Sequence, residues 1–530
     1  MSDDVKRPEL GKLRSIFWPI YQTELRKFLP MGLLLVCILF IYTLCRDLKD
    51  TLIQTLATGG GTEMLSALKL CFVLPLSVVF VVLFMKLSDK FSNAQLFYGV
   101  ITFFVAYFVL FGFVLFPRVD SLHGSLEFIE KTRAKLPWLH WIIPCVTNWT
   151  YSLAYIFAEL WGSAVISLLF WGFANEITRT NEAPRFYSFF GFLGNIGLLA
   201  SGKLVQVLSD SAEKKTDIPE MEAFGLNLKW QMFFVLVCGI LTIVIYWWMQ
   251  KNVLTDPNLY TPGVGTKKKK HKMGIGESVK YVCTNPYVLF IALLVLAYGM
   301  SINLVEVLWK SQAKQFYTDS NAYSKFMGGV SFRTGWLTMV IMFIGTYTLK
   351  NFKWRFAALF TPVFTGVTAL ILFGVLLYKD KVGDAPVSFG AGLWGASLLP
   401  ASVWLGMYQV ACAKGVKYSL FDATKNMAYL PLSREEKLRS QAAVEVIGSR
   451  AGKGSGAMIV SVLTNFIWPG KTVTMQPVMG IVMCLTIGGV LLWILSVVKI
   501  NPAVISKMEE RAREEEDAKA RPASKAPAEA

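Results

Sequence analysis

The sequence predicts an all-α membrane protein, and three observations support this fold class. The chain has 530 residues, of which 54% are hydrophobic and only 17% charged, fewer charges than a soluble protein of this length would carry. Apolar runs of about twenty residues, the length at which a helix spans a bilayer, recur along the whole chain. The eight cysteines fall mostly inside these runs, which indicates buried thiols rather than a disulfide framework.

Twelve runs are long and apolar enough to be transmembrane helices, and we expect them at 31–56, 64–86, 95–116, 141–175, 184–208, 230–250, 287–310, 328–349, 355–378, 392–414, 440–468 and 477–498. The fourth run is long for one span and short for two. Pro144 and Asn148 near its start indicate a preamble followed by one long helix. With the N-terminus inside, most of the 53 Lys and Arg residues fall on the inner side, so both termini are expected in the cytoplasm.

The longest inner loop divides the chain into two halves. Residues 251–286 contain a run of four lysines and leave six predicted spans on each side. This pattern predicts two six-helix bundles, at 31–250 and 287–498, an arrangement like that of major-facilitator transporters. Residues 1–30 are expected to form an amphipathic cytoplasmic segment on the membrane surface. The charged tail, 499–530, is expected to begin as a short helix and end in disorder.

Basic residues inside the first two spans are the first candidates for a functional site. Arg46, Lys49 and Lys69 are expected at a similar depth, with Tyr42 on the same helix face as the first two. A charge inside a membrane span costs a few kcal/mol or more, and it therefore tends to mark function. The alternative is that these side chains extend along the helix to reach lipid headgroups.

Two further candidates lie in the fourth and fifth spans. Glu159 stands near the middle of its span with no positive charge within one turn, so its partner must come from another helix or from a ligand. The alternative is a protonated acid that is hydrogen-bonded inside the bundle. Asn195 lies on a glycine-rich helix and could bond a base or ribose, although such glycines more often serve helix packing.

The seventh span ends in a polar face. Asn303, Glu306 and Lys310 are spaced so that all three lie on one side of the helix. We expect Lys310 to lie nearer water than Glu306, which would then need a cation from the facing bundle, with Lys69 and Arg46 as the best candidates. The alternative is a terminal Glu–Lys pair, worth only tenths of a kcal/mol.

The eleventh span carries two cations among glycines, Arg450 and Lys453. The sequence Gly-Lys-Gly-Ser around Lys453 is not a phosphate-binding P-loop, because Ile447 and Gly454 stand where that motif needs a glycine and a hydroxyl residue. What remains is a membrane helix with two fixed cations, an arrangement that suits a polyanion.

The mostly basic set of buried charges favours an anionic substrate, and the number of cations favours phosphates over a single carboxylate. None of the three histidines lies in a clear span, and no metal-ligand cluster or nucleophile–His–acid set is visible. We therefore expect neither a cofactor nor a metal nor a catalytic centre. The net charge of +17 is largely explained by inner loops, so it does not indicate nucleic acid.

Several long strings resemble a known family. They are Arg46-Asp-Leu-Lys-Asp-Thr, Ala158-Glu-Leu-Trp-Gly-Ser, Leu169-Phe-Trp-Gly-Phe-Ala-Asn, Tyr298-Gly-Met-Ser-Ile-Asn-Leu-Val-Glu-Val-Leu-Trp-Lys-Ser and Lys417-Tyr-Ser-Leu-Phe-Asp-Ala-Thr-Lys-Asn-Met-Ala-Tyr-Leu-Pro-Leu. The likeness runs from about residue 20 to 500 and is to the nucleotide transporters of plastids and obligate intracellular bacteria, above all the ATP/ADP antiporters of chlamydia-like bacteria. It implies an inner-membrane protein that imports host ATP in exchange for ADP, with phosphate able to accompany ADP.

The resemblance places the family's critical charged positions on Lys69, Glu159, Glu306 and Lys453. The full set of expected substrate-binding residues is Lys69, Glu159, Asn195, Asn303, Glu306, Lys453, Arg46, Lys49 and Arg450. We expect one lysine from each half, Lys69 and Lys453, to hold the phosphates, and the two asparagines to contact the base or sugar. The two glutamates would pair with lysines when the site is empty, so that the empty carrier resists changing conformation.

Two other functions remain open at this point. A proton-coupled nucleotide symporter would use Glu159 or Glu306 as a proton site, and a broad-specificity exchanger would accept other nucleotides as well. A membrane enzyme would need the catalytic set that is not found. The expected partners are ATP, ADP, phosphate and the lipid bilayer, with the chain acting as a monomer. Finally, the acidic residues between the fifth and sixth spans, including Asp210, Glu213 and Glu220, are expected to be a solvated surface without a role in transport.

Overall fold

The structure, a computed structural model, describes residues 20–88, 90–178, 182–215, 217–256, 259–260, 275–383, 398–429, 432, 444, 449–468, 475 and 477–520. Every regular element in these ranges is a helix. In the first half the helices are α2 (Leu25–Thr51), α3 (Thr62–Ala67), α4 (Leu74–Ser88), α5 (Asn93–Leu110), α6 (Val119–Leu122), α7 (Leu126–Lys135), α8 (Ile143–Thr147), α9 (Trp149–Trp161), α10 (Trp171–Ile177), α11 (Ala183–Glu213) and α12 (Glu220–Asn252). In the second half they are α13 (Ile275–Thr284), α14 (Pro286–Phe316), α15 (Ser320–Asn351), α16 (Trp354–Val382), α17 (Leu398–Val416), α18 (Asp422–Met427), α20 (Ser449–Val462) and α21 (Val478–Ala520).

Several helices continue into, or are joined by, wider π-helical segments. These are η2 (Leu52–Leu56), η3 (Leu68–Val73), η4 (Phe111–Leu115), η7 (Gly162–Phe170), η8 (Lys417–Phe421) and η10 (Leu463–Ile467). Short 3₁₀ turns lie at Gln22–Glu24, Phe116–Arg118 and Pro137–Leu139. A π-helical turn holds one extra residue and is frequent at functional sites, and three of these segments, η3, η7 and η8, contribute side chains to the cavity described below.

Ten helical segments in the described part of the chain are long and apolar enough to cross a membrane. They match the first nine expected runs and the twelfth. The first segment begins earlier than expected, because Pro30 lies inside α2 rather than before it. The fourth expected run resolves into the short helix α8 and a single span at Trp149–Ala174, which confirms the preamble inferred from Pro144 and Asn148. The expected runs 392–414 and 440–468 lie partly outside the described residues, where α17 and α20 are their described parts.

Two sets of buried apolar side chains lie on either side of the chain's midpoint. One connected cluster is built from residues between Ile20 and Val253. Four smaller clusters are built from residues between Val288 and Val504. None of these clusters in the described part of the chain combines side chains from both halves. Each half therefore buries most of its own apolar surface, and apolar contacts between the halves, such as Phe192 with Phe343, lie outside these clusters.

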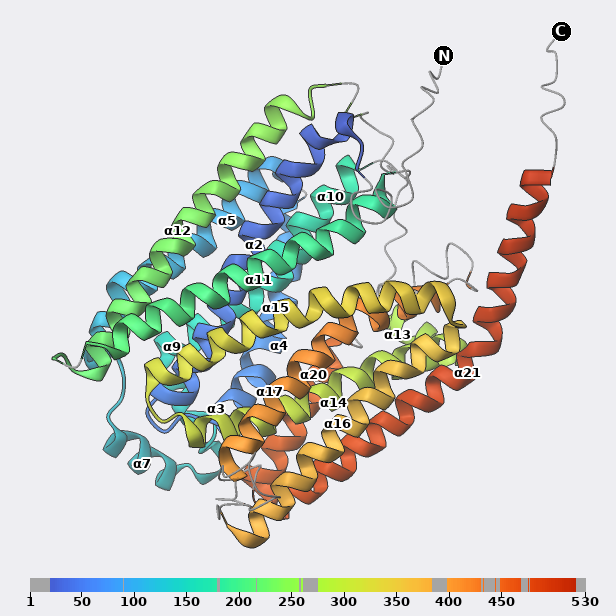
Figure 1. Cartoon of the computed structure of the whole chain (residues 1–530). Coiled ribbons are helices and arrows are strands. Elements are labelled where there is room, and N and C mark those ends of the chain that lie inside the picture. The colour runs from blue at the N-terminus through green and yellow to red at the C-terminus, as the bar shows by residue number, and fades with distance from the viewer. Residues whose placement is uncertain are drawn as a thin grey trace, which may run out of the picture.

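The contact between the halves runs along α11 and α15, which lie side by side through the middle of the molecule (Figure 1). Glycines allow their close crossing: a Cβ on Gly202 would come within 2.5 Å of the backbone N of Phe332, and one on Gly328 within 2.9 Å of the backbone O of Gly202. Helix α2 from the first half also packs on α15. The two halves thus approach each other backbone to backbone, as membrane helices with small residues do.

One end of the molecule is closed by polar links between the halves. This far end, at the lower left of Figure 1, carries α7 and the connections from α11 to α12 and from α14 to α15. There Lys325 at the start of α15 pairs with Asp210 and Glu213 at the end of α11, the latter at 2.8 Å. Glu220 accepts a hydrogen bond from the backbone N of Ser320 at 2.9 Å.

The sequence did not indicate these partners, but Asp210 and Lys325 are 47% and 40% exposed, so the expectation of a solvated surface without a role in transport stays a prediction. The helices α11 and α15 extend beyond the apolar runs, and their polar ends meet each other. At the other end of the chain, α21 continues without a break to Ala520, so residues 499–520 of the expected tail are helical.

Candidate functional site

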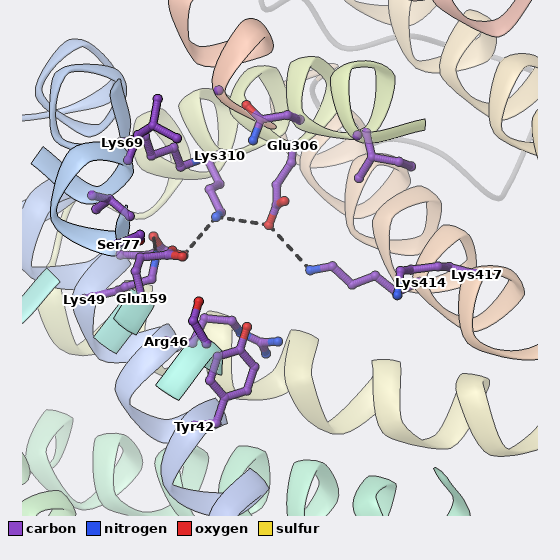
Figure 2. Close-up of a pocket in the computed structure, with 18 of the residues that line it drawn as sticks. Tyr42, Arg46, Lys49, Lys69, Ser77, Glu159, Glu306, Lys310, Lys414 and Lys417 are labelled. Atoms are coloured by element: carbon purple, nitrogen blue, oxygen red, sulfur yellow. Dashed lines mark hydrogen bonds and ion pairs between the residues drawn. The ribbon is translucent and has the colours of Figure 1, made fainter. Parts of the chain in front are cut away.

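A cavity of about 290 Å³ lies between the two halves, near the middle of the helices (Figure 2). Its lining comes from α2, η3, α4, α9 and η7 of the first half and from α14, α17, η8 and α20 of the second half. The lining includes six cationic side chains, Arg46, Lys49, Lys69, Lys310, Lys414 and Lys417, and three carboxylates, Asp50, Glu159 and Glu306. Among the described residues, the cavity wall therefore carries three more cations than carboxylates.

A chain of ion pairs with alternating charge crosses this cavity. It starts in the first half, where Glu159 lies 3.0 Å from Lys49, and Lys49 lies 2.9 Å from Asp50. Asp50 then pairs with Lys310 of the second half at 2.8 Å. These pairs share their charged groups, so moving one side chain changes the electrostatic environment of all the others.

The chain of ion pairs continues within the second half. Lys310 lies 3.1 Å from Glu306, and Glu306 lies 3.4 Å from Lys414. Figure 2 shows Glu306 between the amino groups of these two lysines. Lys417, on η8, pairs with Asp422 at 3.0 Å. All three lysines of this wall therefore have a carboxylate partner.

Lys69 differs from the other cations that line the cavity. It lies in the π-helical segment η3, and among the residues that the structure describes it has no ion-pair partner. It is only partly exposed. An ammonium group that is partly removed from water and lacks a counterion is poised to bind an anionic ligand.

Helix α2 presents one polar face to the cavity. Tyr42, Arg46 and Lys49 all line it, as their spacing predicted. The guanidinium of Arg46 pairs with Asp47 at 3.2 Å and donates to the Ser331 hydroxyl of α15 at 2.9 Å. The amino group of Lys49 also lies 4.1 Å above the ring of Tyr155. These basic side chains are thus held within the protein interior, which excludes their extension to lipid headgroups in this structure.

Six of the nine expected substrate-binding residues line the cavity: Arg46, Lys49, Lys69, Glu159, Asn303 and Glu306. Asn303 is 5% exposed, and its Oδ1 has no hydrogen-bond partner among the described residues. A buried carbonyl oxygen without a donor is unusual, so this atom is available to accept a bond from a ligand. That these residues bind substrate remains a prediction.

The other three expected residues are placed differently or not described. Asn195 does not line the cavity; its amide donates to the backbone O of Gly191 at 2.8 Å and lies 3.9 Å from the sulfur of Met342. The glycine-rich helix therefore serves packing at this position. The side chains of Arg450 and Lys453 lie outside the described residues. Their helix α20 packs on α14, and Gly454, next to Lys453, lines the cavity.

The expected partners of Glu306 were wrong. Its carboxylate pairs with two lysines of its own half, Lys310 and Lys414, rather than with Lys69 or Arg46 of the facing half. Lys310 is not near water, because its side chain is only 7% exposed. The pair with Lys310 is therefore part of a buried network, not a terminal pair at the surface.

Sequence reasoning gave no role to Asp50, Lys414 and Lys417. Asp50 follows Lys49 directly, so the two look like a local neutral pair. Lys414 and Lys417 stand at the end of an apolar run, where a basic residue usually marks the interface. Their spacing of three residues was the available signal, because it places both on one helix face.

Solved structures share this fold. A bacterial homologue of the iron transporter ferroportin in an inward-facing state aligns with 91% of this chain and 100% of its own length, with a TM-score of 0.54 and 12% identity. A mutant of the nucleoside transporter NupG aligns with 89% of this chain and 99% of its own, with a TM-score of 0.51 and 10% identity. At this level of identity the two likenesses show the fold alone, an all-helical arrangement found in solved structures of membrane transporters.

Sequence comparison identifies the family to which the chain belongs. The family described as TLC ATP/ADP transporter matches residues 3–503. The ADP,ATP carrier protein 1 of Chlamydia pneumoniae is 40% identical over 503 residues, which cover 94% of this chain and 95% of the relative. The protein of the same name from Rickettsia prowazekii is 42% identical over 465 residues, which cover 87% and 90%. The chain belongs to the TLC ATP/ADP transporter family.

Proposed function

We propose that this protein is an antiporter that imports ATP in exchange for ADP by alternating access. The observation that carries the proposal is the cavity charge: three more cations than carboxylates, and a lysine without an ion-pair partner among the described residues. ATP is a tetra-anion and ADP a tri-anion when fully ionised, so both fit such a site. Membership of the TLC ATP/ADP transporter family supports the same substrate pair.

Within this proposal, Lys69 is the first phosphate ligand. Lys453 would be its counterpart from the second half, and Gly454 beside it places that part of α20 at the cavity wall. Lys49, Arg46 and Arg450 would add to the positive field around the phosphates. Asn303 offers a free Oδ1 to the base or ribose. The Asn195 amide bonds to its own helix in this conformation, so contact with the nucleotide would need a different conformation.

The glutamates keep the empty site neutralised. Glu159 pairs with Lys49, and Glu306 pairs with Lys310 and Lys414. A nucleotide would replace these carboxylates as the partner of the lysines, and alternating access would then carry it to the other side. Exchange of a tetra-anion for a tri-anion moves net charge, which is worth about 2.3 kcal/mol per 100 mV of membrane potential. Phosphate bound together with ADP as the monoanion would remove that contribution, because the two sides of the exchange would then carry equal charge.

We further place twelve transmembrane helices in two six-helix bundles, at 31–250 and 287–498. The separate apolar clusters of the two halves support this division, as do α17 and α20, which occupy the two expected runs that complete the count. The protein is placed in a bacterial inner membrane with both termini in the cytoplasm, because basic residues concentrate in the loops on that side. The polar links at the far end then correspond to closure toward the outside. A monomer suffices for this mechanism.

The function can be tested with purified protein in proteoliposomes. Uptake of radiolabelled ATP should be strong when the vesicles contain ADP and near background when they contain no nucleotide, with protein-free vesicles as the control. Unlabelled ADP should compete with ATP better than GTP or CTP does. Uptake that needs only a pH gradient would instead show a proton-coupled symporter, and equal competition by all nucleotides would show a broad-specificity exchanger.

A further inference from the structure

Asp50 lies at the centre of the ion-pair chain, in a position that nucleotide recognition does not explain. Its side chain is 2% exposed. Its Oδ1 accepts from the amino group of Lys49 at 2.9 Å, and its Oδ2 accepts from that of Lys310 at 2.8 Å. Lys49 belongs to the first half and Lys310 to the second, so one carboxylate is shared between the two halves.

A carboxylate at this point opposes the binding of nucleotide. It occupies two ammonium groups that phosphate oxygens could use, and its charge repels theirs. The same geometry, however, makes Asp50 an internal substitute for a phosphate group, because both are anions that accept charge-assisted bonds from two amino groups. The empty cavity therefore contains its own anion at the place where the halves meet.

The neighbouring carboxylates are arranged differently. The pair of Glu159 with Lys49 stays within the first half, and the pairs of Glu306 with Lys310 and Lys414 stay within the second half. These pairs can persist while the halves move relative to each other. The pair of Asp50 with Lys310 joins α2 to α14 and cannot persist if these helices separate.

We propose that Asp50 is the positioning residue that makes transport an obligatory exchange; this rests on the proposed antiport function. In the empty carrier, Asp50 holds Lys310 and thereby holds the halves together at the level of the cavity. Separating them would break a buried charge-assisted bond and leave Asp50 with Lys49 alone and Lys310 with Glu306 alone, which is unfavourable in the protein interior. A bound nucleotide offers its phosphates to Lys310, while Asp50 keeps Lys49. The loaded carrier can then change conformation, and the empty carrier cannot.

The experiment compares two uptake measurements on the same proteoliposomes. One measures labelled ATP uptake into vesicles that contain ADP, and the other measures uptake into vesicles without nucleotide. For Asp50→Asn, uptake without internal nucleotide should rise about tenfold over the unmutated protein, while exchange should change by less than about threefold. Asp50→Glu, which keeps a carboxylate within reach of Lys310, should retain the coupling of the unmutated protein.

A matched control lies one turn earlier on the same helix. Asp47 is also 2% exposed and also reaches the second half, but its partner there is the hydroxyl of Ser331 rather than a cation. Asp47→Asn should therefore leave uptake without internal nucleotide at background, whatever it does to exchange. If this variant releases uptake as strongly as Asp50→Asn, the loss of any charge on α2 uncouples the carrier and the assignment to Asp50 is wrong.

Other outcomes also decide the matter. An Asp50→Asn variant that remains an obligatory exchanger overturns the proposal, as does one that loses exchange altogether while it still binds ATP. Uncoupling by Asp50→Glu would show that the shape of the site, not the ion pair, is what matters. Failure of the unmutated protein to exchange ATP for ADP would contradict the proposed function instead, and the coupling test can then be repeated with whichever labelled nucleotide is transported.

Discussion

The two walls of the cavity carry similar residues but hold them in different states. On the wall from the first half, Lys69 has no ion-pair partner among the described residues. On the wall from the second half, Lys310, Lys414 and Lys417 each have a carboxylate within 3.4 Å. A cation without a partner can bind an incoming phosphate at no electrostatic loss, whereas a paired one must first exchange its partner. Lys69 of the first wall is thus prepared for substrate, whereas the paired cations, which include Arg46 and Lys49 of the same wall, respond to it.

The largest effect is expected from removing the cation without a partner. Lys69→Ala should lower ATP exchange about 10- to 100-fold, because a lost charge-assisted contact costs about 1.5–3 kcal/mol. Lys417→Ala removes an ammonium that Asp422 already neutralises at 3.0 Å, so its loss should be several-fold smaller. Exchange rates of both variants, normalised to the protein incorporated in the vesicles, test the difference. Equal losses would mean that the two walls do not differ as described.

A second test replaces the carboxylate that neutralises the second wall. Glu306→Gln releases Lys310 and Lys414 together, so ATP should still bind, with an affinity within about tenfold of the unmutated protein, or 1.4 kcal/mol. Exchange should slow by about tenfold, since Lys414 then loses its carboxylate partner and Lys310 keeps only Asp50 while the empty cavity passes through the conformational change. Calorimetric binding and exchange are to be measured on one preparation.

Glu159→Gln provides the comparison for that test. It removes a partner of Lys49, but Lys49 keeps Asp50 at 2.9 Å, so its effect on exchange should be smaller than that of Glu306→Gln. If binding and exchange both fall by orders of magnitude in Glu306→Gln, this carboxylate contacts the nucleotide directly and does not act through the lysines.

The smallest effect is expected at the far end, away from both walls. Lys325→Met removes the pairs with Asp210 and Glu213, but the lysine side chain is 40% exposed, and such pairs contribute about 0–1 kcal/mol. Exchange should therefore change by less than about fivefold. Lys381→Met, at an exposed position on α16, is the control for loss of surface charge. A loss beyond tenfold in Lys325→Met alone would show that the far-end links are an essential part of the transport cycle.

Much of the site could be predicted, because a charged side chain inside an apolar run is expected to face the interior of the protein rather than lipid. Lys69, Glu159 and Glu306 each interrupt such a run, and each lines the cavity. The partners could not be predicted, because hydropathy gives depth along a helix but not which helices face each other. For this reason Glu306 was predicted to pair with cations of the facing half, and Lys310 was predicted to lie near water.

The fold was predicted to a similar degree and for a related reason. Apolar runs locate the spans, but the polar ends of α11 and α15 have no apolar signal, so their extension and their mutual contact were missed. Asp50 was missed because a carboxylate next to a lysine looks neutral in sequence, although its second oxygen reaches a lysine 260 residues away. Asn195 was predicted to contact the ligand, because glycine-rich helices both pack closely and line binding sites.

The alternating chain of carboxylates and lysines also affects which solutes are excluded from the cavity. An open cluster of lysines would attract small anions such as chloride. Here most of the lysines already have bonded carboxylates as partners, so a lone monovalent ion gains little by entering and cannot displace several carboxylates at once. A triphosphate or diphosphate presents many oxygens on one molecule and can replace them together. We therefore expect the carrier's own carboxylates to favour multivalent solutes over small ions before any group recognises adenine.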